Sequence, residues 1–171
     1  MIEPLMKSVE VPCGQAEAFR IFVHEMGSWW PLAKRSMSLK ASGKPAKSLR
    51  VDPRLGGRIV EIGSDGAEYH WGTIRAMDPS HSVAMDFHMG MPPEQASLVE
   101  VTFVPLAEDR TRVTLTQSNW ENFGDMAEML RKGYDTGWEV IFAQAYVAAC
   151  DGRRSLRAMG GVRDLPEPRS D

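Results

Sequence analysis

With 171 residues, 43% of them hydrophobic and 25% charged, the chain has the size and composition of one globular domain with a core of its own. Its net charge of −3 argues against a nucleic-acid-binding protein or a general binder of anionic membranes. No run approaches the roughly 18 apolar residues of a membrane span. The N-terminus has no basic segment followed by an apolar one, so we expect a cytoplasmic protein without a signal peptide.

The domain is expected to span residues 1–152. Residues 153–171 are rich in Arg and Pro and are typical of a flexible tail. The two cysteines, Cys13 and Cys150, lie far apart in the sequence, and in a cytoplasmic chain we expect two thiols rather than a disulfide. Eleven Met and five Trp predict an adaptable, aromatic-rich interior.

The N-terminal part predicts a strand, a helix and a sharp corner. Residues 7–12 alternate between apolar and polar side chains, as a half-buried strand does. Residues 15–27 carry apolar side chains at helical spacing, with Gly27 as the C-cap. Because Pro31 ends any helix before it, Trp29 and Trp30 lie at a corner. We expect Trp30 to turn inward and Trp29 to pack on the helix end or stand partly exposed; the alternative is plain corner packing of both.

Residues 32–47 are basic and small and lack a clear period, which predicts a loop with one short helical turn. From about residue 48 to 120 six segments alternate with period two, separated by clusters of Gly, Pro, Asp and Ser. Such short connections favour antiparallel neighbours. With the first strand they predict a seven-stranded antiparallel sheet. Gly72 predicts a bulge or a close backbone approach beside Trp71, whose register the pattern leaves open.

A long helix is predicted over about residues 125–150. Gly133 and Gly137, each unfavourable in a helix by about 1 kcal/mol, indicate a kink, a late start or a close approach to the sheet. The apolar stripe is predicted to run through Met126, Leu130, Tyr134, Trp138, Ile141, Ala145 and Ala148. The order of strand, helix, six strands and long helix predicts an α+β fold in which a curved sheet wraps around one helix. Such a fold leaves an interior cavity, the usual kind of ligand site.

Alternation assigns the side chains that would line this cavity. If Val113 and Leu115 face the helix, Gln117 and Asn119 lie on the same face. These amides either orient a polar group of a ligand or cap backbone groups near the strand end, because a buried amide without a partner costs about 1–3 kcal/mol. The expected ligand-binding residues are Trp30, Trp71, Met85, Phe87, Val101, Phe103, Leu115, Gln117, Asn119, Tyr134, Trp138 and Ile141.

A resemblance to a known family rests on an ordered set of segments. These are VEVPCGQAEAFRIF, WWP, PRLGGRIVEI, WGTIRAMDPSHSVAMDF, VEVTFVPLAEDRTRVTLTQSNW and GWEVIF. Together they resemble the START-like (SRPBCC, helix-grip) superfamily, and most closely the activator of heat-shock-protein-90 ATPase homologue-like family, over about residues 5–150. The resemblance implies a helix-grip domain with a hydrophobic pocket. It implies less about function, because this fold hosts carriers, cyclases, receptors and chaperone partners.

These features favour a binding module that encloses a small hydrophobic or amphipathic molecule, driven by burial of the ligand's apolar area. One alternative, implied by the resemblance, is a co-chaperone-like domain of the stress response. It would use the outer face of the sheet and the basic residues 33–47 against an acidic surface of a chaperone. Another alternative is an enzyme of the polyketide cyclase/dehydratase type. We expect a monomer or a homodimer and no nucleic-acid partner.

Signals for catalysis are weak. The four histidines have no metal-ligand spacing, and the chain has no nucleophile-elbow or phosphate-binding motif. We therefore assign no catalytic residue, no metal and no cofactor. His88 is expected on the solvent side of its strand, paired with Asp86 at the surface. An enzyme would need an interior acid or base, for which Asp86, His70 and Tyr134 are the candidates.

Overall fold

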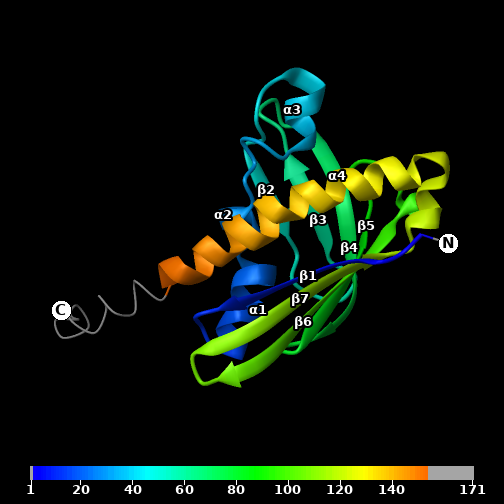
Figure 1. Ribbon diagram of the computed structural model, residues 1–171. Helices are drawn as coiled ribbons and strands as arrows, with labels where there is room; N and C mark the ends of the chain where they lie inside the picture. Colours follow the sequence, from blue (N-terminus) through cyan, green and yellow to red (C-terminus); the bar gives the residue numbers. More distant parts are fainter. Residues whose placement is uncertain (1, 154–171) are drawn as a thin grey trace, which may run out of the picture.

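A curved antiparallel sheet wraps around one long C-terminal helix in the computed structural model, which describes residues 2–153 (Figure 1). The seven strands follow the order β1-β7-β6-β5-β4-β3-β2. They are β1 (Leu5–Val11), β2 (Ser48–Val51), β3 (Arg58–Ile62), β4 (Glu68–Asp78), β5 (Ser82–Phe87), β6 (Ser97–Ala107) and β7 (Arg110–Ser118). The predicted α+β helix-grip architecture is confirmed.

Helical segments lie between β1 and β2, between β5 and β6, and after β7. They are α1 (Gln15–His24), α2 (Met26–Trp29), α3 (Met37–Ser42), α4 (Ala127–Val140), the 3-10 segments η1 (Pro93–Gln95) and η2 (Trp120–Met126), and the π-helical segment η3 (Ile141–Tyr146). The helix continues after η3 through Arg153. Arg153, the first residue of the predicted tail, is therefore helical. The rest of that tail lies outside the described residues. Among residues 2–153, no helix is both long and apolar enough to cross a bilayer.

Side-chain alternation on the central strands builds the core. In the β6–β7 pair, Val101 lies opposite Leu115 and Phe103 opposite Val113, and all four side chains are buried. The residues that alternate with them on β6, Glu100 and Thr102, are exposed. One face of the sheet therefore packs on the helices while the other faces solvent, as period-two alternation predicts.

A β-bulge on β4 resolves the register around Trp71. Ile59 of β3 lies opposite Gly72 and Val60 lies opposite His70, which leaves Trp71 as the extra residue. Because a bulge shifts the alternation by one position, Trp71 and Ile74 both face the interior and are buried. A side chain at position 72 would overlap the carbonyl oxygen of Asp86 on β5. The predicted close approach at Gly72 is therefore confirmed.

The corner after α1 is formed by a second short helix. Gly27 lies within α2 rather than capping α1, and a Cβ there would overlap the carbonyl oxygen of Leu49 on β2. Glycine thus permits α2 to pack directly on the edge strand. Trp29 is buried and donates its indole N–H to the carbonyl of Ile21 at 2.7 Å. Trp30 turns inward, as predicted, and is also buried.

The long helix changes its buried face where η3 begins. A π-helical turn contains one more residue than an α-helical turn and rotates the face that follows. Phe142, Tyr146 and Cys150 are buried there, and the predicted stripe residue Ala148 is exposed. The predicted first residue of the stripe is also wrong, because Met126 precedes α4 and is 40% exposed. The 3.6-residue period holds only in the middle of the helix.

An ion-pair cluster joins the edge strand β1 to α4. The Lys7 ammonium lies 2.6 Å from Asp135 and 2.8 Å from Glu139. Hydrogen bonding to Asp135 and Glu139 raises the pKa of Lys7, and the hydrogen bond from Lys7 lowers the pKa of Asp135. This surface cluster links β1 to the solvent-facing side of α4.

Replacing Gly72 with Ala is expected to lower the free energy of unfolding by about 1–3 kcal/mol, because β4 and β5 must separate to accept a methyl group. Gly133→Ala on α4 is the matched control. A Cβ there meets nothing within 4 Å, and alanine favours the helix by about 1 kcal/mol. Urea denaturation followed by tryptophan fluorescence measures both. A Gly72→Ala protein as stable as wild type would contradict the close approach.

Candidate functional site

An aromatic cluster fills the space between the sheet and α4. Trp30, from the corner, lies with its ring centroid 4.7 Å from that of Trp71 on β4 and 5.8 Å from that of Trp138 on α4. Phe87 on β5 contacts both Trp30 and Trp138, and Tyr134 stacks on Trp138 at 6.1 Å. Edge-to-face and offset contacts of this kind stabilise aromatic pairs beyond their buried area. We call these five residues the aromatic cluster.

Gln117 on β7 supplies the polar group of this interior. It is fully buried. Its Oε1 accepts a hydrogen bond from Trp138 Nε1 at 2.8 Å, and its Nε2 donates to Ser97 Oγ at 2.9 Å. Ser97 Oγ in turn donates to the carbonyl of Phe87 at 2.8 Å. The amide therefore bonds side chains from α4 and β6 rather than capping the end of its own strand.

A second buried polar group, Glu61 on β3, was missed by the sequence analysis. Its side chain is fully buried and accepts the indole N–H of Trp71 at 2.9 Å. It also accepts the backbone N–H groups of Met37 and Ser38 at 2.7 Å each, and the hydroxyl of Ser38. Alternation would have placed Glu61 inside, since Ile59, two residues earlier, is buried.

Glu61 fastens α3 to the sheet. The backbone N–H groups at the start of a helix have no partner within the helix, and a carboxylate is a favourable acceptor for them. Ser36 caps the same helix, its Oγ accepting from Leu39 N at 3.3 Å. The predicted helical turn in residues 32–47 is confirmed, and it is held against the interior through one carboxylate.

The other predicted ligand-binding residues separate into groups. Met85, Val101, Leu115 and Ile141 are buried against the core. Phe103 is buried too, but its ring contacts Phe19 and Phe22 beneath α1. Asn119 is exposed, so the prediction that it faces the interior is wrong. β7 ends at Ser118, and Asn119 has a φ of 64°, which ends the alternation.

His88 also departs from its predicted place. β5 ends at Phe87, and His88 is buried rather than on the solvent side with Asp86. Its ring packs edge-on against His70 at 4.7 Å, and its Nδ1 has no hydrogen-bond partner among the described residues. Burial, followed by the positive charge on His70, lowers the pKa of His88. Burial and then Arg58 lower the pKa of His70.

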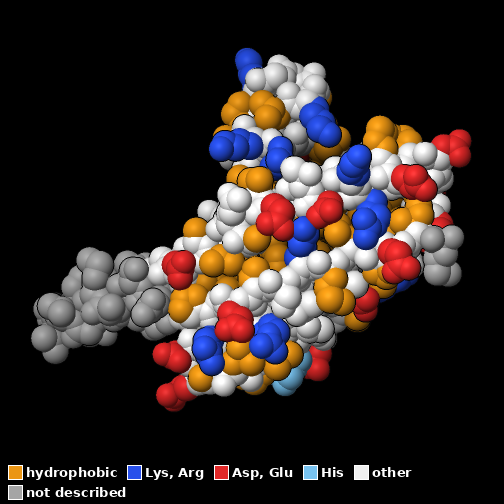
Figure 2. All heavy atoms as spheres, in the orientation of Figure 1, with side chains coloured by type: hydrophobic (Ala, Val, Ile, Leu, Met, Phe, Trp, Pro, Cys, Tyr) orange, Lys and Arg blue, Asp and Glu red, His pale blue; other side chains and the backbone are white. Residues whose placement is uncertain are grey.

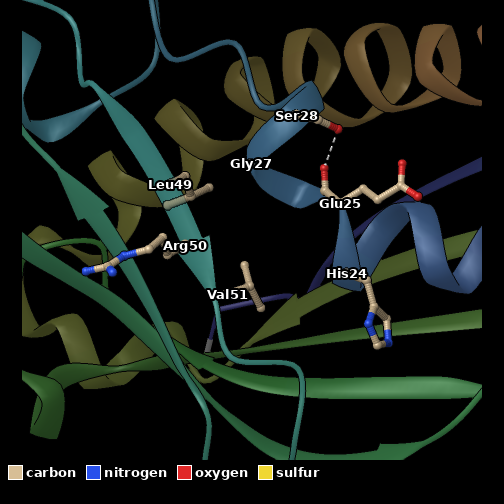
Figure 3. A pocket seen from close by; sticks show the side chains of 7 residues that line it. All are labelled: His24, Glu25, Gly27, Ser28, Leu49, Arg50 and Val51. Atoms are coloured by element: carbon tan, nitrogen blue, oxygen red, sulfur yellow. Dashed lines mark hydrogen bonds between the residues drawn. The ribbon is translucent and has the colours of Figure 1, made fainter.

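Two hollows lie outside the aromatic cluster, along the edge strand β2. The first, about 460 Å³, lies between the α1–α2 corner and β2 (Figure 3). It is lined by His24, Glu25, Gly27, Ser28, Leu49, Arg50 and Val51. The second, about 430 Å³, adjoins it and is lined by Arg50, Val51, Asp52, Arg54, Gly56, Arg58, Val60 and Glu68. Neither is lined by a predicted ligand-binding residue.

A projecting lobe around α3 is strongly basic. Residues 31–50, which we call the basic lobe, contain Lys34, Arg35, Lys40, Lys44, Lys47 and Arg50 and no Asp or Glu. The four lysines are exposed, and Figure 2 shows blue side chains gathered on this lobe. A chain with a net charge of −3 therefore concentrates positive charge at one end. Among residues 2–153, no group of three or more His, Cys, Asp or Glu is placed to hold a metal ion.

A curved seven-stranded sheet that grips one long helix defines a START-like domain. The sequence profile of the family described as "Activator of Hsp90 ATPase homolog 1-like protein" matches residues 16–145, and the chain belongs to that family.

Solved structures share the fold. An anthrahydroquino-γ-pyrone synthase, Txn09, complexed with SUM, is 34% identical, with 78% of this chain and 88% of that chain covered and a TM-score of 0.56. CalC, a self-sacrificing resistance protein from Micromonospora echinospora, is 25% identical, with 88% and 95% covered and a TM-score of 0.64. The Aha1 dimer from Colwellia psychrerythraea is 14% identical, with 81% and 90% covered and a TM-score of 0.57. No functionally curated protein matches the chain.

Replacing Glu61 with Gln is expected to lower the free energy of unfolding by about 2–3 kcal/mol. The amide keeps the shape of the side chain, but its NH₂ group replaces an oxygen that accepts N–H groups in the wild type. At least one of those N–H donors would be left without an acceptor. Glu100→Gln on the exposed face of β6 is the control and should change little. Denaturation in urea measures both variants. A Glu61→Gln protein with an unchanged midpoint would show that the carboxylate does not fasten α3.

His88 predicts a dependence of stability on pH. Because its pKa is lowered in the fold, the unfolded chain takes up a proton at higher pH than the folded chain. Its contribution is therefore complete above about pH 6.5 and declines as the pH falls through that value toward the folded pKa. His88→Leu should reduce the fall in unfolding free energy between about pH 7 and 5. Equal slopes for His88→Leu and wild type would refute this origin.

Proposed function

We propose that this domain binds a flat, largely apolar aromatic molecule between the sheet and α4. The observation that carries the proposal is the aromatic cluster. Five aromatic side chains from four separate segments converge on one region, beside one buried amide, Gln117. Ligand pockets typically combine such apolar walls with few polar groups. The walls would supply burial and ring stacking, and Gln117 would exchange its bond to Trp138 for one to a ligand hydroxyl or carbonyl.

Access to the cluster requires side chains to move, because Trp30 fills the space between Trp71 and Trp138. Its edge is suited to such movement. Met37, Met89 and Met91 are partly buried against the core, and Met37 lies against the turn at Gly90. The backbone N–H of Met89 donates to the carbonyl of Trp71 at 2.9 Å, and that of Met37 donates to Glu61, which also bonds Trp71. Methionine is unbranched and adapts to different shapes. We assign the ligand's route to this edge, between α3 and the turn after β5.

The comparisons support binding of a small molecule. The relative at 34% identity is a synthase complexed with SUM, and the relative at 25% identity is a self-sacrificing resistance protein. Catalysis has less support among the described residues. The oxygens of Glu61 already accept several hydrogen bonds, and Asp86 pairs with Arg75 at 3.4 Å on the surface. We propose a cytoplasmic binding module rather than a cyclase.

Titration of tryptophan fluorescence with hydroxyanthraquinone, supported by native mass spectrometry, tests the binding proposal. Saturable quenching and a one-to-one complex are expected. Trp30→Ala and Gln117→Leu should each weaken binding at least about tenfold, equivalent to about 1.4 kcal/mol. Thr116→Ala, next to Gln117 and pointing to the other face, is the control. A fatty acid of similar length should bind more weakly, because it cannot stack. Equal affinity in wild type and both interior variants would place the ligand elsewhere.

A second candidate function is supported by the basic lobe. Its uncompensated positive charge fits an acidic protein surface, and the chain belongs to the family of Hsp90 ATPase activator homologues. In this alternative the domain is a co-chaperone, as a monomer or as a dimer.

The co-chaperone alternative predicts a salt-sensitive complex with an Hsp90 protein. Changing Lys34, Lys40, Lys44 and Lys47 together to Glu should reduce the affinity at least about tenfold and abolish any stimulation of ATPase activity. Lys132→Glu, on the exposed side of α4, should have little effect. Absence of a complex at low ionic strength would reject this alternative. The proposal that the domain binds an aromatic molecule is tested separately and would still stand.

A further inference from the structure

The two cysteines meet in space although 136 residues separate them in the sequence. Cys13 lies at the corner between β1 and α1, and Cys150 lies in the last described turns of the C-terminal helix. Both side chains are fully buried and reduced, and their thiols are hydrogen-bonded to each other. A thiol pair in contact, carried by two different elements, is the starting geometry for a disulfide.

Neighbouring contacts hold the two elements together. Thr111 Oγ1 donates to the carbonyl of Cys13 at 2.8 Å, and the Tyr146 hydroxyl donates to the carbonyl of Ala18 at 2.7 Å. Arg153 pairs with Glu17 and Glu25 on α1 and its C-cap. Figure 1 shows the orange end of the C-terminal helix running above α1. The cysteines therefore face each other across a junction that is fixed on both sides of the pair.

We propose that Cys13 and Cys150 form a reversible intramolecular disulfide when the protein meets an oxidising low-molecular-weight disulfide such as glutathione disulfide. One cysteine thiolate attacks glutathione disulfide and releases one glutathione. The other cysteine then attacks the mixed disulfide and releases a second glutathione. Two S–H bonds are lost and one S–S bond forms, and the two electrons and two protons end on the two glutathione molecules. Cytoplasmic disulfides of this kind are usually transient and regulatory.

The surroundings set the rate of this reaction. The hydrogen bond from Cys13, followed by burial, raises the pKa of Cys150, and the charge of Glu17 acts in the same direction. The Tyr146 hydroxyl, hydrogen-bonded to the Cys150 thiol, acts in the opposite direction. Little thiolate is present at neutral pH, and an oxidant reaches the pair only when the last helical turns open. Oxidation is thus slow, and the bond, once formed, is shielded from reductants.

The disulfide would join the beginning of the domain to its end. It closes a loop that contains β2 to β7, every strand of the sheet except β1, and restricting so long a loop stabilises the folded chain. It also fixes the end of the long helix opposite the methionine-lined edge. Opening of the helix from the sheet at that end is then blocked.

Incubation of the full chain with glutathione disulfide at mildly alkaline pH tests the proposal. The protein is then unfolded in urea with excess N-ethylmaleimide, which alkylates free thiols, and its mass is measured by mass spectrometry. Loss of two hydrogens, no maleimide adduct and a linked peptide pair containing Cys13 and Cys150 are expected. The oxidised protein should melt about 5 °C or more above the reduced one, and dithiothreitol should reverse both changes.

Cys13→Ala and Cys150→Ala are the controls, and neither should gain thermal stability from oxidation. The comparison of oxidised with reduced wild type needs no variant, so the test survives if a variant fails to fold. Two maleimide adducts after prolonged oxidation, separate glutathione adducts on the two cysteines, or only intermolecular dimers would overturn the proposal.

Discussion

The buried polar contact between the long helix and the sheet is the hydrogen bond from the Trp138 indole to the amide of Gln117. It adds to the surface ion pairs of Lys7 and to the bond from Tyr146 to Ala18. Dispersion and burial hold α4 against the sheet, but they are non-directional. A buried donor that would lose its acceptor on sliding fixes the register. Once Trp138 is fixed, Trp30 packs against its edge and Trp71 against Trp30. Trp71 donates its indole N–H to Glu61, and Glu61 also accepts the backbone N–H of Ser38 at the start of α3.

This sequence of contacts links elements that are distant in the chain. The corner after α1, the bulge on β4 and the lobe around α3 all take their places from the same interior side chains. The bulge is necessary to this arrangement, since an unbulged β4 would turn either Trp71 or Ile74 toward solvent. The close approach of backbones at Gly72 is the local condition for the bulge. Polar groups in this interior therefore specify geometry, while aromatic side chains supply most of its burial.

Periodicity was sufficient to predict the sheet and the long helix, because each depends on a repeated pattern. The inward turn of Trp30 was predicted from its place at the corner before Pro31. Periodicity failed where a pattern was extended past the end of its element. Asn119 and His88 each follow the last residue of a strand, so the alternation that places Gln117 and Phe87 inside no longer applies to them. Ala148 follows a π-helical turn, which the composition of residues 141–146 does not predict. Glu61 is different: its position was readable by alternation, but its acceptance of hydrogen bonds from α3 and Trp71 needs the tertiary structure.

The described residues contain two features of different character, one in the interior and one on the surface. An aromatic interior with a methionine-lined edge suits a small molecule, and a basic lobe suits an acidic protein. The two meet at α3, whose N-terminus is held by the interior carboxylate while its lysines face outward. Glu61 joins the two, because it accepts hydrogen bonds from Trp71 in the interior and from Ser38 in α3. Small-molecule binding and partner binding need not be exclusive in such a molecule.

The grouping of Trp30, Trp71 and Trp138 has a spectroscopic consequence. Ring centroids 4.7 and 5.8 Å apart place these indoles well within the range of resonance energy transfer, so excitation of one is shared among all three. Their emission is then governed by whichever indole is quenched most strongly. Their aromatic transitions also couple, which gives the near-ultraviolet circular dichroism an exciton component. These three indoles are therefore expected to respond as a coupled group, so that a disturbance at one ring alters the emission of the other two.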